Sequence, residues 1–94
     1  MNLTQEQLKG IKDCAYRLIT PELVAINVGV DETDFMDELR TAGSPVRNSF
    51  YRGYVRQLIE TREAIIKAAQ NGSNPAQAEL IGFMKELSQH LAHG

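Results

Sequence analysis

Residues 20–39 read TPELVAINVGVDETDFMDEL, and this segment decides the fold. A proline opens its first helix, where the missing N–H is no loss, and the Asp31 side chain can cap the start of a second helix. Between them, Gly29 can adopt a positive φ without a Cβ penalty. The segment therefore predicts a helix over residues 21–28, a turn, and a second helix over about 32–41.

The apolar residues of this segment are spaced as a helix-turn-helix requires. The first helix needs a small residue where the second approaches it, the turn needs a glycine, and apolar side chains must fill the wedge between the helices. The residues that we expect in these structural roles are Ala25, Gly29, Val30, Phe35 and Leu39. An ordinary helical hairpin with a glycine turn stays open as the alternative, because short motifs also arise by chance.

Similar signals predict three further helices, so we expect an all-α protein with about five helices. A capping box at Thr4 opens an N-terminal helix. A serine–proline pair at Ser44 opens a long helix that continues to Asn71, roughly 40 Å for about 26 residues. Asn74, followed by proline, is expected to cap the last helix. We expect the last two helices to lie antiparallel as a hairpin.

Two regions follow from this pattern. Residues 1–43 would hold the N-terminal helix and the helix-turn-helix, and residues 44–94 the hairpin, within one compact unit overall. The apolar stripe of the long helix exceeds what the last helix can cover, which favours association between copies, as a dimer or a ring. Arg62 falls within this stripe, and we expect it to pair with an acid of another helix or subunit, because a buried guanidinium needs a partner.

The net charge of −2 hides a division along the chain. Residues 31–38 hold five acids, whereas residues 40–56 hold four arginines and no acid. The candidate nucleic-acid-binding residues are these arginines, Arg40, Arg47, Arg52 and Arg56, with Tyr51 and Tyr54 nearby. Arginines neutralise phosphates, and aromatic side chains often accompany them in nucleic-acid sites. The alternative is that the arginines pair with the acids, in the same chain or a neighbouring one.

Residue patterns for other kinds of function are missing or isolated. The chain has one cysteine and no apolar run of membrane-spanning length, so we expect a soluble cytoplasmic protein without disulfides. No glycine-rich phosphate loop, Cys/His cluster or activated nucleophile predicts an enzyme or a cofactor. His90 and His93 are three residues apart but lack a third ligand, so no metal site is predicted.

Several stretches follow the pattern of a known family. They are LVAINVGVD at 23–31 with Phe35 after it, SPVR at 44–47, FYRG at 50–53, AAQNG at 68–72 and NPA at 74–76. From about residue 20 to residue 84 the chain thereby resembles the small subunit of phage terminases, including prophage-encoded relatives. The resemblance implies a DNA-binding helix-turn-helix, a central hairpin that assembles subunits into a ring, and delivery of viral DNA to a motor subunit.

The second helix of the motif departs from a typical DNA reader. Its exposed positions are expected to carry acids, namely Glu32, Asp34, Asp37 and Glu38. Phosphates would repel these carboxylates in a major groove, and relatives often place an aromatic or aliphatic residue at the position of Glu38. We predict a DNA-binding helix-turn-helix protein. The second hypothesis is an oligomeric assembly or adaptor protein that uses the acidic helix to bind a protein partner, without DNA.

Overall fold

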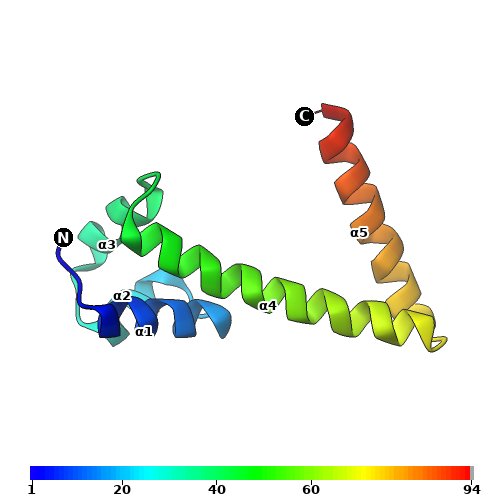
Figure 1. Ribbon diagram of the computed structural model, residues 1–94, viewed down its shortest axis with the longest axis horizontal. Coiled ribbons are helices and arrows are strands. Elements are labelled where there is room, and N and C mark those ends of the chain that lie inside the picture. Colours follow the sequence, from blue (N-terminus) through cyan, green and yellow to red (C-terminus); the bar gives the residue numbers. More distant parts are fainter. Residues whose placement is uncertain (94) are drawn as a thin grey trace. The chain divides into compact units, whose positions relative to one another are not determined.

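The protein is a series of five α-helices (Figure 1). The computed structural model describes residues 1–93, and the helices in it are α1 (Gln5–Tyr16), α2 (Pro21–Val28), α3 (Glu32–Arg40), α4 (Pro45–Gln70) and α5 (Asn74–His93). No strand occurs among these described residues, so the all-α prediction with five helices is confirmed. The chain divides into two compact units, an N-terminal unit (Met1–Leu58) and a C-terminal unit (Ile59–Gly94), with the boundary inside α4.

Three helices begin with the side-chain caps that the sequence predicts. Thr4, Asp31 and Ser44 each accept a hydrogen bond from the backbone N–H three residues later, at 3.0, 2.9 and 3.0 Å respectively. Gln7 completes the capping box at α1 by accepting from the Thr4 N–H at 3.0 Å. Each cap satisfies a backbone donor that has no partner inside its helix, which fixes where the helix begins.

The other two helix starts differ from the predicted caps. Thr20 precedes Pro21 with extended backbone but makes no side-chain hydrogen bond to the helix. The prediction that Asn74 caps α5 is wrong by one residue, because Asn74 already lies in the helix and the Ser73 hydroxyl accepts from the Ala76 N–H at 3.4 Å. Proline therefore occupies the second helical position of α5, where its missing N–H is equally harmless.

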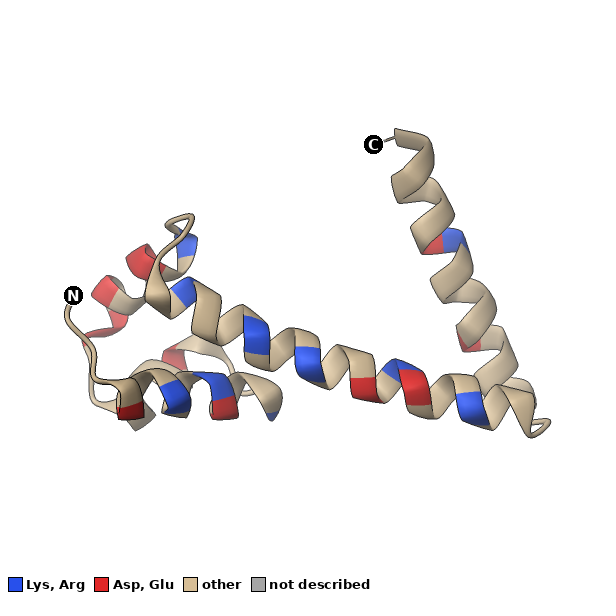
Figure 2. Cartoon of the chain, in the orientation of Figure 1, with Lys and Arg blue, Asp and Glu red and all other residues tan. Residues whose placement is uncertain are grey.

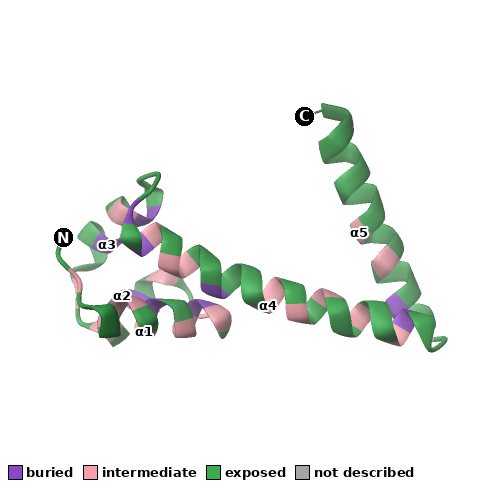
Figure 3. Ribbon diagram, in the orientation of Figure 1, coloured by how far each residue is buried: buried purple, intermediate pink, exposed green. Residues whose placement is uncertain are grey.

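The core of the N-terminal unit lies where α1, α2, α3 and the start of α4 meet (Figure 3). Its buried members are Ile11, Val24, Ala25, Phe35, Leu39 and Val46. Ala25, Phe35 and Leu39 of the helix-turn-helix are thus buried in this core, and half-buried Val30 packs against it. Val46 belongs to this core without having been predicted, so the first turn of α4 helps to hold the motif together.

Gly29 ends α2 as predicted, with φ at +79°. In this left-handed conformation the N–H groups of Gly29 and Val30 both donate to the Ala25 carbonyl, each at 3.0 Å. The last carbonyls of α2 are satisfied by this reversal, and the chain turns directly into the cap of α3. The turn between the two helices is therefore only three residues long, from Gly29 to Asp31.

Gly53 lets α4 lie directly on α1. A Cβ atom at this position would stand 2.0 Å from the Lys12 carbonyl oxygen, far inside van der Waals contact. Next to this contact, the Gln57 side-chain amide donates to the Tyr16 carbonyl at the end of α1, at 2.8 Å. The first half of α4 is thus tied to α1, which explains why the unit boundary falls within α4.

Leu18 reverses the chain after α1 with a backbone that leucine rarely adopts. Its φ is +63°, the one positive value among the described residues other than glycine. The N–H of Leu18 donates to the Ala15 carbonyl at 2.9 Å, and the N–H of Ile19 donates to the Cys14 carbonyl at 3.2 Å. The geometry is that of a glycine-type helix end, but the residue is a leucine whose side chain is 60% exposed.

Replacing Leu18 by asparagine is expected to raise the free energy of unfolding by up to about 1 kcal/mol. The left-handed conformation costs an ordinary L-residue about 1–2 kcal/mol, asparagine adopts it more readily, and the exposed leucine contributes little burial. Urea denaturation followed by circular dichroism measures the change. Leu18→Ala is the control, since it removes the same side chain and keeps the backbone penalty; equal stability of the two variants would contradict the prediction.

The C-terminal unit is packed near its turn and open beyond it. Ala69 and Ala76 are buried on either side of Asn71–Ser73, and the Gln77 amide donates to the Ala69 carbonyl at 3.1 Å. Farther along α5, Leu80 and Phe83 are half-buried. The remaining large apolar residues of the helix are exposed, namely Ile81, Met84, Leu87 and Leu91. The C-terminal unit therefore leaves apolar surface uncovered, but most of it lies on α5, whereas the sequence predicts it on the stripe of the long helix.

Arg62 pairs with an acid of another helix, as predicted. One of its terminal nitrogens lies 3.6 Å from a carboxylate oxygen of Glu86 on α5, and the guanidinium carbon lies 4.1 Å from the centre of the Phe83 ring. The Arg62 side chain is 41% exposed, however, so it is not the buried group that its place in the stripe suggests. An ion pair this exposed contributes little to the stability of the fold.

Candidate nucleic-acid interface

The four candidate arginines lie on two surfaces of the N-terminal unit, whose basic and acidic residues Figure 2 shows. Arg47 and Arg56 are nine residues apart on α4, about two and a half turns, so their side chains leave opposite sides of the helix. Arg52 and Arg56 are four residues apart and share one side. The sequence-predicted cluster is therefore divided by the helix that carries most of it.

Arg47 joins the end of α3 to the start of α4. Its guanidinium donates to the Leu39 carbonyl at 2.9 Å and lies 4.8 Å from the centre of the Tyr51 ring. Arg40, which follows Leu39 directly in the chain, is exposed at the end of α3. A guanidinium has five N–H donors, so Arg47 keeps donors for a phosphate while bound to the carbonyl.

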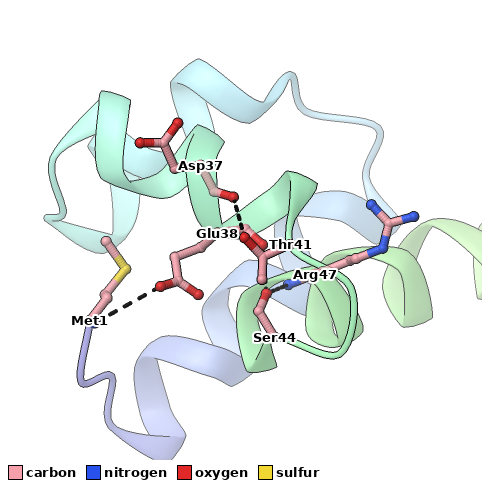
Figure 4. A network of polar contacts seen from close by, with 6 residues as sticks. All are labelled: Met1, Asp37, Glu38, Thr41, Ser44 and Arg47. Atoms are coloured by element: carbon pink, nitrogen blue, oxygen red, sulfur yellow. Dashed lines mark hydrogen bonds and ion pairs between the residues drawn. The ribbon is translucent and has the colours of Figure 1, made fainter.

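Ser44 fixes this junction. Its hydroxyl donates to the Glu38 carbonyl at 2.6 Å and accepts from the Arg47 N–H at 3.0 Å, so one buried group satisfies the end of α3 and the start of α4 (Figure 4). The Thr41 hydroxyl donates to the Asp37 carbonyl at 2.8 Å in the same turn. The position of Arg47 therefore depends on a built hydrogen-bond network rather than on a flexible loop.

The acids of α3 do not neutralise Arg47. The Glu38 carboxylate lies 3.9 Å from the N-terminal amine of Met1, and the Arg47 side chain extends away from the carboxylates of Asp37 and Glu38 (Figure 4). Glu32, Asp34 and Asp37 are exposed. At this junction, the acidic and basic side chains thus point to different surfaces, which differs from the charge compensation that their nearness in sequence suggests.

Arg47 shares its side of α4 with three aromatic residues. Phe50 and Tyr51 lie three and four residues after Arg47, and Tyr54 lies four and three residues after them, so the four side chains share one side of the helix and form an aromatic strip. The Phe50 and Tyr51 rings lie edge to face with centroids 5.8 Å apart. Tyr51 is 41% exposed and Tyr54 is 38% exposed. The strip is thus partly exposed, and the Arg47 guanidinium lies over the Tyr51 ring at one end of it.

An apolar groove continues the aromatic strip toward the end of α1. It is lined mainly by Ala15, Leu18, Ile19, Pro21, Phe50 and Tyr54, with a volume of about 290 Å³. The left-handed backbone of Leu18 places that side chain at the groove. The sequence gives no signal for this groove, since leucine does not predict a left-handed turn and the groove needs α1 and α4 side by side.

Arg52 and Arg56 lie on the other side of α4, where α1 adds further positive charge. The contact at Gly53 brings the Lys12 backbone beside Arg52, and the bond to Tyr16 brings the neighbouring Arg17 close to the turn that holds Arg56. The exposed residues Lys12, Arg17, Arg52 and Arg56 are here called the second basic surface, and the acids Asp13 and Glu60 lie on the same two helices. The two cations of α1 were missed, because only the packing of α1 on α4 gathers them with the arginines.

Comparisons of the chain with protein-family models, with curated proteins and with solved structures give no match. Within residues 1–93, no group of three or more His, Cys, Asp or Glu side chains could hold a metal ion. The described helices also include none long and apolar enough to span a membrane. The exposed arginines and the aromatic strip remain the features on which a function can be argued.

Proposed function

We propose that the protein is an oligomeric DNA-binding protein of the helix-turn-helix type, similar to the small subunit of phage terminases. The observation that carries the proposal is the set of arginines on two sides of α4, of which Arg52 and Arg56 are exposed and Arg47 is half-buried, beside the packed motif of α2 and α3. Phosphate neutralisation by lysine and arginine supplies most of the sequence-independent affinity of DNA-binding proteins. Exposed arginines on a rigid helix can supply this affinity.

In this proposal the phosphates contact α4 and α1 rather than the exposed side of α3. The carboxylates of Glu32, Asp34 and Asp37 would face the phosphates if α3 entered a major groove. Arg52 and Arg56 lie instead on the long helix that follows the motif, in the stretch from residue 40 to residue 56 that carries no acid. Duplex binding of this kind fixes position on DNA and carries little sequence information.

Reversing two charges tests the second basic surface. The variant Arg52→Glu with Arg56→Glu is expected to bind a labelled DNA duplex at least about tenfold more weakly at low salt. The slope of the logarithm of the binding constant against the logarithm of the salt concentration should fall by about two, because two phosphate contacts are lost. Fluorescence anisotropy over a series of salt concentrations measures both quantities. The matched control is Lys67→Glu with Lys85→Glu, which makes the same change in net charge on exposed residues of the C-terminal unit.

The acidic helix supports a second candidate function, an adaptor that binds a basic protein surface without DNA. The supporting observation is that Glu32, Asp34 and Asp37 are exposed on one short helix whose opposite face is anchored by Phe35. The two functions predict opposite effects for Asp34→Asn with Asp37→Asn: stronger DNA binding under the first, loss of the protein partner under the second. Absence of DNA binding by the unaltered protein at low salt would contradict the first function.

A further inference from the structure

The aromatic strip has partly exposed tyrosines, which the binding of duplex phosphates does not need. Tyr51 and Tyr54 are partly exposed and Tyr54 lines an apolar groove, whereas a duplex presents its base edges in the grooves and keeps the base faces stacked inside. Single strands expose those faces, and proteins bind them by stacking bases on aromatic side chains within a positively charged groove. The chemistry of the strip therefore matches unpaired bases better than paired ones.

Positive charge stands at one end of this apolar surface. Arg47 contacts the Leu39 carbonyl and the Tyr51 ring, and the exposed Arg40 follows Leu39 in the chain at the end of α3. A strand whose bases enter the groove at Tyr54 would carry its phosphates along the strip toward these two guanidinium groups. Aromatic rings that can stack on bases thus lie on the same side of α4 as a cation that can bind phosphates. A single-stranded nucleic acid requires both features of its binding site.

We infer that the aromatic strip and its groove bind single-stranded DNA, with a base stacked at Tyr54 and phosphates near Arg47 and Arg40. Seven residues of α4 separate Arg47 from Tyr54, about 10 Å of helix, which matches roughly three stacked nucleotides at about 3.4 Å each. The inference deepens the proposed function, because it rests on DNA as the ligand and names the form of DNA that this second surface takes.

Paired oligonucleotides test the inference. Fluorescence anisotropy compares a labelled oligothymidylate with the same strand annealed to its complement. The unaltered protein is expected to bind the single strand more tightly than the duplex. Tyr54→Ala should weaken single-strand binding about tenfold or more and leave duplex binding unchanged, because it removes the ring on which a base stacks. Tyr54→Phe keeps the ring and should remain within about twofold of the unaltered protein.

Two further variants separate this surface from the rest of the protein. Arg47→Gln should weaken single-strand binding and lower its salt dependence by about one phosphate. Leu23→Ala changes an exposed apolar residue of α2 that does not line the groove, and it should have no effect. Circular dichroism spectra of all variants establish that the helices are retained, so that a loss of binding can be assigned to the substituted side chain.

The outcomes distinguish the inference from the proposed function. Duplex binding equal to or tighter than single-strand binding, with no effect of Tyr54→Ala, would overturn the inference while leaving DNA binding in place. No binding of either oligonucleotide at low salt would overturn both. A loss of single-strand binding in Tyr54→Ala alone, with the duplex still bound through Arg52 and Arg56, would support both and place them on different sides of α4.

Discussion

Gly53→Ala is expected to destabilise the protein by about 3 kcal/mol, the upper part of the usual range for overpacking. The added Cβ would lie 2.0 Å from the Lys12 carbonyl oxygen and 3.0 Å from the Tyr16 nitrogen, so it meets backbone that cannot rotate away. Either α1 lifts off α4 or α4 bends. Both changes weaken the bond from Gln57 to the end of α1 and disturb the core around Val46. Urea and thermal denaturation followed by circular dichroism measure the loss.

Gly82→Ala is the matched control for this prediction. Gly82 lies within α5, and nothing stands within 4 Å of a Cβ atom built there. Alanine at such a site stabilises a helix by about 0.5–1 kcal/mol, because glycine loses more conformational freedom on folding. The same substitution should therefore have opposite signs at the two positions. Equal stabilisation of both variants would show that the close contact of α1 with α4 does not exist.

Leu87→Glu is expected to convert the proposed oligomer into a monomer at micromolar concentration. Leu80, Met84, Leu87 and Leu91 follow one another at spacings of four and three residues, the seam by which helices associate. Burial of one leucine contributes about 1.5–3 kcal/mol, and each copy in the oligomer would bury its own Leu87. Loss of this burial in every copy should raise the dissociation constant about a hundredfold or more. Light scattering coupled to size-exclusion chromatography measures the mass.

The control for assembly is Gln89→Glu, which adds the same charge on the opposite side of α5. Leu87 is 61% exposed, so its substitution leaves the fold of each copy intact and changes only what a second copy can bury. The mass of Gln89→Glu should equal that of the unaltered protein. A monomeric mass for the unaltered protein at micromolar concentration would contradict self-association through this helix.

Local signals predicted the parts of the fold that depend on residues near one another in sequence. A cap, a glycine and the spacing from Ala25 to Leu39 suffice for α2, its turn and α3, since each requirement is met within a few residues. The same holds for the caps at Thr4 and Ser44. Ser73 was missed as the cap of α5 because asparagine and serine are both good N-caps, and only the observed start of the helix separates adjacent candidates.

The features of the fold and site that depend on contacts between distant segments could not be predicted from local sequence signals. No local signal explains the glycine at position 53, whose role becomes evident only when α1 lies against it. The groove at Leu18 needs the same packing. The separation of the arginines, by contrast, could have been predicted from the sequence. Arg47 and Arg56 are nine residues apart, and at 3.6 residues per turn this spacing puts them on opposite sides of a helix. Nearness in sequence was mistaken there for nearness in space.

The distribution of tyrosines has a practical consequence for unfolding experiments. The chain contains no tryptophan, and its three tyrosines, Tyr16, Tyr51 and Tyr54, all lie in the N-terminal unit. Intrinsic fluorescence therefore reports on α1 and the first half of α4 alone, whereas far-ultraviolet circular dichroism reports on all five helices. A difference between the two denaturation curves would reveal independent melting of the C-terminal unit without any label, and coincident curves would indicate that both units unfold together.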